Sequence, residues 1–141
     1  MLSWLRKSLG KTPAADPLAV VNVGHGGFNF AVVGEQSYQS NLRKASGGRA
    51  ERGERPVIGC QLRYEINPRT HGPAVRVDAI GAGTVGHFPA DQATLYVAAF
   101  QELERGGHVA ECQGVLVGGQ PDKPFFGIYL DFKPKLLGSR E

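Results

Sequence analysis

A chain of 141 residues fits one domain and is too short for a catalytic domain joined to a second folded unit. Its 41% hydrophobic and 21% charged residues are ordinary for a globular protein. Its start carries neither a long apolar run nor a cleavable signal pattern, so we expect a cytoplasmic protein without a transmembrane segment. Twenty glycines and nine prolines favour short strands joined by tight turns over a helical bundle.

The positive charge is concentrated in one part of the chain. The net charge is +3, yet residues 41–76 carry eight basic and three acidic residues, a net +5, which leaves −2 for the rest. A surface that faces phosphates needs such a concentration of arginine. A solvated loop with interspersed arginine and glutamate would have a similar composition. Both interpretations stay open at the level of sequence.

The two cysteines, Cys60 and Cys112, lie far apart in the sequence and belong to no CxxC or Cys-His pattern. A zinc site or a disulfide framework is therefore not implied, and we expect buried free thiols. The four histidines are scattered along the chain at no spacing typical of metal ligands. Neither a metal site nor a cofactor is predicted.

The first segment, residues 1–17, is expected to be an N-terminal tail or a short amphipathic helix followed by a linker. A helix would place Leu2, Leu5 and Leu9 on one face with Trp4 alongside. Such a stripe suits docking to a partner or to a membrane surface. A helix this short is marginal by itself, which favours a frayed tail or packing on its own domain.

Extended segments follow the linker. Residues 18–23 and 28–33 are predicted to be strands on either side of a glycine-rich turn. A short helical segment is expected over residues 38–46, where two glycines end it. A basic loop over residues 49–56 leads to the next strand.

The clearest strands are residues 57–66 and 74–80, because apolar and polar residues alternate in both. One side of each strand is therefore expected to face the core and the other side to face solvent. Arg63 and Arg76 fall on the solvent side, so we expect them to share one face of the sheet.

The second half of the chain completes a barrel. We expect, in order, a strand over residues 84–88, a helix over residues 89–105, strands over residues 108–117 and 125–133, and a tail over residues 134–141. In the last strand Phe126, Ile128, Leu130 and Phe132 alternate with Gly127, Tyr129 and Asp131. About six strands predict a mainly β fold over residues 18–133, a small OB-like barrel with one main helix and a short helical segment.

One glycine-rich stretch has the form of a dinucleotide-binding motif. Residues 81–86, GAGTVG, match GxGxxG after a strand. In a dinucleotide-binding unit the third glycine opens a helix, whereas here the chain continues as a strand and has no repeated βαβ units. A glycine-rich hairpin turn is the better interpretation. Because GxSxG, HExxH and P-loop motifs are also missing, we expect no enzymatic activity.

An ordered set of short motifs resembles the HIRAN family over residues 28–132. The motifs are FAVVG at residues 30–34 with Tyr38, LR at 62–63, NP at 67–68, AVRV at 74–77, TVGHF at 84–88, and stretches at 114–118 and 127–131 that are similar to bacterial members. The resemblance implies an OB-like barrel that binds single-stranded DNA, notably DNA 3′ ends, in repair or replication. It also implies that any ATPase or nuclease activity belongs to a helicase or nuclease partner acting in trans.

The resemblance implies a nucleic-acid-binding groove that includes Gln36, Tyr38, Asn67, Arg69, His71 and His87. We expect Arg63 and Arg76 to lie near this groove and to take part in binding. In such a groove arginine neutralises phosphates while aromatic faces stack on unpaired bases. Asn67 is expected to hydrogen-bond a terminal sugar or a base edge. Structural roles compete at two positions, because Asn67 and Pro68 form a good turn by themselves and His87 would satisfy the hydrogen bond of a buried strand end.

The sequence departs from the family pattern where bases are expected to stack. Tyr64 and Glu65 replace the family's EP, Arg69 and Thr70 replace its YD, Gly72 and Pro73 with one added residue replace an asparagine, and Ser37 replaces an aromatic residue of DNA-binding relatives. An arginine can stack through its guanidinium plane, but it holds a base less specifically. The alternative function is therefore a protein-interaction module that keeps the barrel without the DNA contacts.

Overall fold

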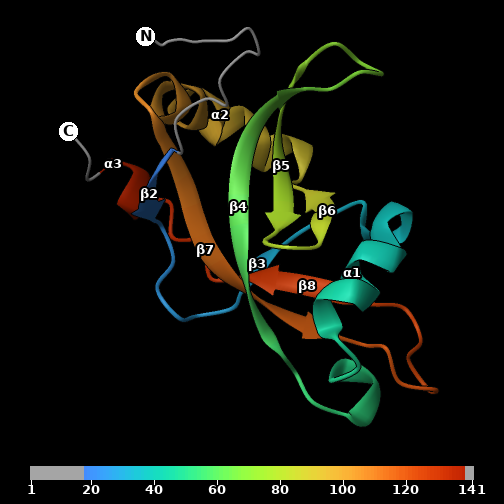
Figure 1. Cartoon of the computed structure of the whole chain (residues 1–141). Helices are drawn as coiled ribbons and strands as arrows, with labels where there is room; N and C mark the ends of the chain where they lie inside the picture. Colours follow the sequence, from blue (N-terminus) through green and yellow to red (C-terminus); the bar gives the residue numbers. More distant parts are fainter. Residues whose placement is uncertain (1–17, 139–141) are drawn as a thin grey trace, which may run out of the picture.

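The computed structural model describes residues 18–138 and contains one sheet of seven strands (Figure 1). The strands are β2 (Ala19–Asn22), β3 (Phe30–Ala31), β4 (Val57–Ile66), β5 (Pro73–Ala79), β6 (Gly83–His87), β7 (His108–Val117) and β8 (Gly127–Leu130). The helical segments are η1 (Glu35–Tyr38), α1 (Gln39–Ser46), η2 (Ala50–Arg52), α2 (Ala90–Arg105) and α3 (Lys135–Gly138). The predicted mainly β fold with one main helix is confirmed, with seven strands in place of about six. The predicted N-terminal segment, residues 1–17, lies outside the described residues.

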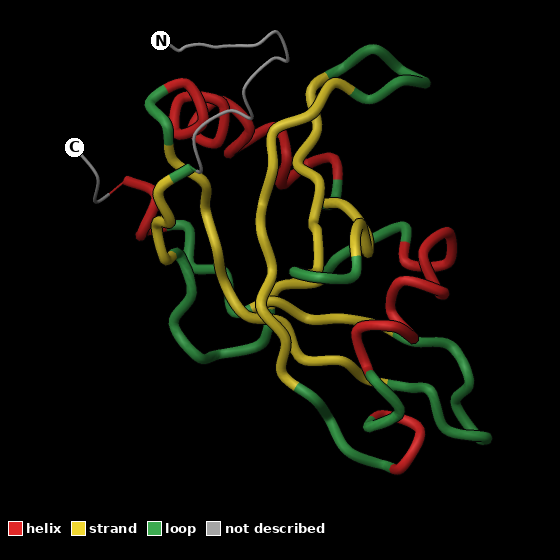
Figure 2. The backbone as a smooth tube through the Cα atoms, in the orientation of Figure 1, coloured by secondary structure: helices red, strands yellow, loops and turns green. Residues whose placement is uncertain are grey.

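The sheet is strongly curled, and its strands follow the order β3, β8, β7, β4, β5, β6. Neighbours on this path are antiparallel, and β2 runs parallel to β7 beside it. Figure 2 shows β4 and β7 as long strands that bend through the middle of the molecule. A tight turn joins β5 to β6 at Gly81 and Gly83, whose φ angles are 84° and 100°. The hairpin interpretation of the GAGTVG stretch is therefore confirmed.

The pairing of β4 with β5 agrees with the alternation of apolar and polar residues in the two strands. Cys60 and Leu62 of β4 and Val75 of β5 are fully buried. Arg63 lies directly opposite Arg76 in the register of the two strands. The two arginines therefore share the outer face of the sheet, as predicted.

One strand, β7, is shared by three others. One of its edges pairs with β4, while the other pairs first with β2 and then with β8. Between β2 and β8 the Asp131 carboxylate accepts hydrogen bonds from the Gln113 N–H at 2.7 Å and the Gly26 N–H at 2.9 Å. The predicted alternation places Asp131 on the outer side, but it is 3% exposed, because β8 ends at Leu130. Charge-assisted hydrogen bonds compensate for the burial of this carboxylate.

The two outer strands of the sheet, β3 and β6, approach each other at a single bridge. Val33, two residues after β3, donates its N–H to the His87 carbonyl at 2.9 Å and accepts the His87 N–H at 2.9 Å. The adjacent Gly86 has no room for a side chain, because a Cβ there would collide with Val32 and lie 2.8 Å from the Val33 carbonyl oxygen. The bridge joins the two edges of the curled sheet into a partly closed barrel.

Aromatic residues and two helices complete the core. Phe30, Phe88, Phe100 and Phe132 form a cluster in which ring centroids lie between 4.6 and 5.9 Å apart. Phe100 comes from α2, which packs across β4, β5 and β7. The fully buried Leu42 comes from α1. Both helices therefore hold the sheet in its curled form.

A third helix, α3, lies in the segment expected to be a tail. Its Leu137 is 8% exposed and belongs to the hydrophobic core. The packed structure thus continues beyond residue 133. Between residues 18 and 138, no helix combines the length and the apolar character needed to cross a bilayer.

Gly86→Ala is expected to lower the free energy of unfolding by about 1–3 kcal/mol, because the added methyl group must displace Val32 or break the bridge between Val33 and His87. Urea unfolding followed by circular dichroism measures the change. Gly106→Ala is the matched control, since its Cβ would meet its neighbours at 3.5 Å or more. An equal loss of stability in both variants would contradict the role given to the bridge.

Cys60 and Cys112 lie opposite each other across β4 and β7 and are buried free thiols, as predicted. Burial is the main cause that raises the pKa of Cys60 to about 12, and burial also raises the pKa of Cys112. The charge of Asp131 adds to both increases. Because the thiolate is the reactive form, neither thiol should react with a chromogenic disulfide reagent near pH 8 in the folded protein.

The same reagent should modify both thiols once the chain is unfolded in guanidinium chloride. Ser40→Cys serves as the positive control, because residue 40 is exposed on α1. Rapid modification of Cys60 and Cys112 in the folded wild type would show that β4 and β7 separate readily, contrary to this prediction.

Candidate nucleic-acid interface

Two parts of the chain that are distant in sequence line one hollow of about 440 Å³, which we call the end hollow. One part is η1 with the preceding Gly34, and the other runs from the end of β4 to β6 and includes the loop between β4 and β5. Five of the eight predicted site residues line it, namely Tyr38, Asn67, Arg69, Arg76 and His87. The structure therefore brings together most of the predicted group, and it adds Glu65 and Thr84 to the lining.

The register of the sheet explains why the floor of the end hollow is polar. Arg76 of β5 lies directly opposite His87 of β6, and Glu65 precedes the end of β4 by one residue. Arg76 and His87 project from the outer face, because Val75, Val77 and Phe88 beside them are buried. The Glu65 side chain lies on the same face, where it contacts both of them. The three side chains are between 19% and 32% exposed.

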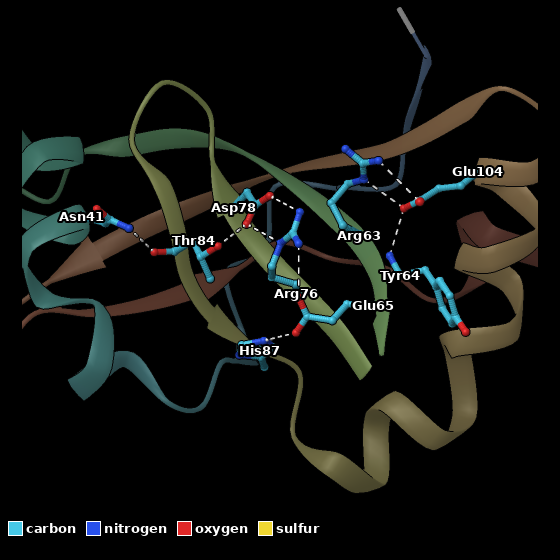
Figure 3. Close-up of polar contacts among 9 residues, drawn as sticks. All are labelled: Asn41, Arg63, Tyr64, Glu65, Arg76, Asp78, Thr84, His87 and Glu104. Atoms are coloured by element: carbon cyan, nitrogen blue, oxygen red, sulfur yellow. Dashed lines mark hydrogen bonds and ion pairs between the residues drawn. The ribbon is translucent and has the colours of Figure 1, made fainter. Parts of the chain in front are cut away.

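Arg76 is held by two carboxylates (Figure 3). Its Nε and Nη2 donate to the two carboxylate oxygens of Asp78, each at 2.9 Å, and its Nη1 donates to Glu65 at 3.2 Å. The hydrogen bonds with Asp78 are the largest cause that raises the pKa of Arg76. The guanidinium is thus fixed in orientation and largely neutralised before any ligand arrives.

The same network reaches β6 and α1. Glu65 contacts the His87 Nε2 at 2.8 Å, so the imidazole faces a carboxylate and not a buried strand end. Thr84 donates its hydroxyl to Asp78 at 2.9 Å, and the Asn41 side chain donates to the Thr84 carbonyl at 2.8 Å. These contacts, which Figure 3 draws, connect β4, β5, β6 and α1 and thereby fix the walls of the end hollow relative to one another.

Arg63 is a predicted site residue whose side chain contacts α2 and does not line the end hollow. Its Nε donates to Glu104 of α2 at 2.9 Å, and the same carboxylate accepts the Tyr64 N–H at 2.9 Å. Arg63 is absent from the lining of the end hollow. Two arginines directly opposite each other would repel, and the acids beside Arg63 and Arg76 remove that cost.

The loop between β4 and β5 carries three more predicted residues. The Asn67 side-chain oxygen accepts the N–H groups of Arg69 at 2.8 Å and of Thr70 at 3.3 Å, so Asn67 has the turn role considered above. His71 is exposed beyond this turn with φ of 58° and does not line the end hollow. Arg69 is exposed and forms no ion pair within residues 18–138.

Gln36 lines a neighbouring hollow of about 560 Å³, which we call the middle hollow and which shares Gly34 with the end hollow. Its lining also includes Lys123 and Phe125, and Phe125 is 65% exposed. Sequence reasoning missed Phe125 because residues 125–133 read as a strand with an inward Phe126, and it missed Lys123 because no motif marks the loop before that strand. The available signal is the Phe125–Phe126 pair itself, because adjacent residues in an extended segment cannot both face the core.

The end hollow has fixed walls and a polar floor, and the middle hollow beside it includes the exposed Phe125 in its lining. No match was found in a scan against protein-family models, a search of curated proteins or a search of solved structures.

Proposed function

We propose that the protein is a nucleic-acid-binding module that takes the end of a single DNA strand into the end hollow. The observation that carries this proposal is the convergence of Tyr38, Asn67, Arg69, Arg76 and His87, from separate segments, on one hollow. The resemblance to the HIRAN family implies a binding role for four of these residues, Tyr38, Asn67, Arg69 and His87. Any chemistry on the bound strand would belong to a partner enzyme.

The size and lining of the end hollow suit one terminal nucleoside. Its volume of about 440 Å³ lies within the range of small-molecule pockets. The Tyr38 ring, whose centroid is 6.0 Å from that of His87, offers an aromatic face for a base. Glu65 and the amide of Asn67 offer hydrogen-bonding groups for a sugar or a base edge.

The charges of the end hollow favour a hydroxyl over a phosphate at its floor. Arg76 is already paired with Glu65 and Asp78, so it has little charge left for an anion. A sugar hydroxyl can donate to the Glu65 carboxylate, whereas a terminal phosphate would be repelled by it. The unpaired Arg69 stands at the rim, where the phosphate that precedes a terminal nucleoside would lie. This arrangement supports recognition of a free strand end.

A second base would meet the middle hollow. The two hollows meet at Gly34, and the exposed Phe125 ring offers a stacking surface there. Phe125 thereby compensates for the aromatic residues that Ser37 and Arg69 replace. Stacking on aromatic side chains tolerates any base, so the proposed site reads the end of a strand and not its sequence.

A labelled oligonucleotide that ends in a 3′ hydroxyl should bind at least about tenfold more tightly than the same oligonucleotide with a 3′ phosphate, because the phosphate meets the Glu65 carboxylate. Fluorescence anisotropy at low salt measures both affinities. An oligonucleotide with a 5′ phosphate is the matched control for charge. Equal affinity of all three would contradict end recognition, and no binding at low salt would contradict the proposed function.

Arg69→Ala should weaken binding by about tenfold without changing thermal stability, because Arg69 is exposed and unpaired among residues 18–138. Arg63→Ala is the matched control. It should leave affinity unchanged but lower stability, because it leaves Glu104 without its partner. Anisotropy titrations and thermal unfolding of both variants measure these effects. The reverse pattern would move the interface from the end hollow to the Arg63 side of the sheet.

A further inference from the structure

An aromatic side chain is uncovered on the outer face of the barrel. In the register of β3, β8, β7 and β4, one row of opposite residues runs from Ala31 through Tyr129 and Val115 to Val57. Tyr129 is 42% exposed and Val57 is 44% exposed. An exposed apolar row that includes an aromatic ring is typical of a contact surface.

Tyr129 lines a third hollow, of about 570 Å³, which we call the Tyr129 hollow. Two cations, Arg55 and Lys123, line it together with Val117 and Gln120, and no carboxylate is among its lining residues. Neither cation has an ion-pair partner within the part of the chain that the structure describes. In contrast to the paired Arg76 of the end hollow, both cations are therefore available to an anion.

The walls of the Tyr129 hollow are held by hydrogen bonds between two loops. The Gln120 side chain donates to the Ala50 carbonyl at 2.6 Å and to the Gly118 carbonyl at 3.0 Å. Figure 1 shows the loop after β7 and the η2 segment at the same end of the sheet. Gly118 has φ of 81°, and a side chain there would collide with the Phe125 carbonyl oxygen. The hollow is therefore built into the fold before a ligand binds.

The three hollows form a continuous series along the surface. The end and middle hollows share Gly34, and the middle and Tyr129 hollows share Val117, Gly118 and Lys123. Each hollow has one aromatic ring available for stacking, and each has at least one cation among its lining residues. A single strand of nucleic acid needs this succession of rings and positive charge.

From this series we infer that the Tyr129 hollow is a second nucleic-acid contact, which binds an inner nucleotide of the strand whose end lies in the end hollow. A base stacks on Tyr129, and a phosphate lies between Arg55 and Lys123. The inference rests on the proposed function and extends it from the strand end to a longer footprint. The end hollow selects a free strand end, while the Tyr129 hollow adds affinity that grows with strand length.

The test compares a three-nucleotide with a twelve-nucleotide single strand, both ending in a 3′ hydroxyl, by anisotropy or calorimetry. We expect the longer strand to bind the wild type more tightly, because OB folds contact about 4–16 nucleotides. The Arg55→Ala/Lys123→Ala variant should lose about tenfold in affinity for the longer strand. Arg55→Ala alone should also weaken binding of the longer strand but keep the affinity for the shorter one, because Arg55 lines the Tyr129 hollow and neither of the other two. Tyr129→Ala should also weaken binding of the longer strand, and Tyr129→Phe should restore it.

Arg105→Ala/Lys133→Ala is the matched control, because it removes two positive charges that line none of the three hollows. Loss of affinity in this variant equal to that of Arg55→Ala/Lys123→Ala would overturn the inference in favour of a general charge effect. Binding of both strands with no gain from length would overturn the inference and leave the end hollow intact. If neither strand binds, the proposed function itself fails.

A polyglutamate peptide tests the other class of partner, an acidic protein segment. It has negative charge without bases, so it should compete with the longer strand only weakly. Tighter binding of polyglutamate than of the longer strand, lost in Arg55→Ala/Lys123→Ala, would overturn the inference and assign the Tyr129 hollow to a protein partner.

Discussion

The arrangement of this protein depends on one pair of backbone hydrogen bonds, between Val33 and His87. These bonds join the two ends of an open path of six paired strands, from β3 to β6, beside which β2 pairs with β7. The approach is possible because Gly86 leaves space for the Val33 carbonyl oxygen. Without the bridge, β6 would be an exposed edge, and η1 would lose the backbone pairing that precedes it in the chain. The partly closed barrel and the end hollow thus have a common origin.

The bridge also determines the chemistry of the end hollow. It brings the Tyr38 ring to 6.0 Å from the His87 ring, while the register of β5 and β6 sets Arg76 opposite His87. Glu65 then contacts both Arg76 and His87. Placing a guanidinium, an imidazole and a carboxylate in one hollow would be costly if any of them lacked a partner. Their mutual pairing makes the hollow rigid and gives it hydrogen-bonding groups with little net charge.

Sequence reasoning reaches the strands and the grouping of the site, but it stops at contacts that depend on long-range packing. The alternation in residues 57–66 and 74–80 is a local property, so it correctly predicts that Arg63 and Arg76 share a face. The partner of Arg63 is 41 residues away on α2, and no local pattern specifies that pairing. Asp131 shows the same limit, because its burial depends on where β8 ends beside β7 and not on the alternation around it.

The concentration of positive charge in residues 41–76 therefore has two different physical meanings within one window. Arg63 and Arg76 are paired with carboxylates and act as fixed donors within the sheet. Arg55 and Arg69 lie in loops, where no carboxylate of residues 18–138 pairs with them, so their charge remains available to an anion. Counting charges along the sequence treats all four alike. The distinction between orientation and attraction arises only when the strands bring acidic neighbours to some arginines and leave the others at the rim.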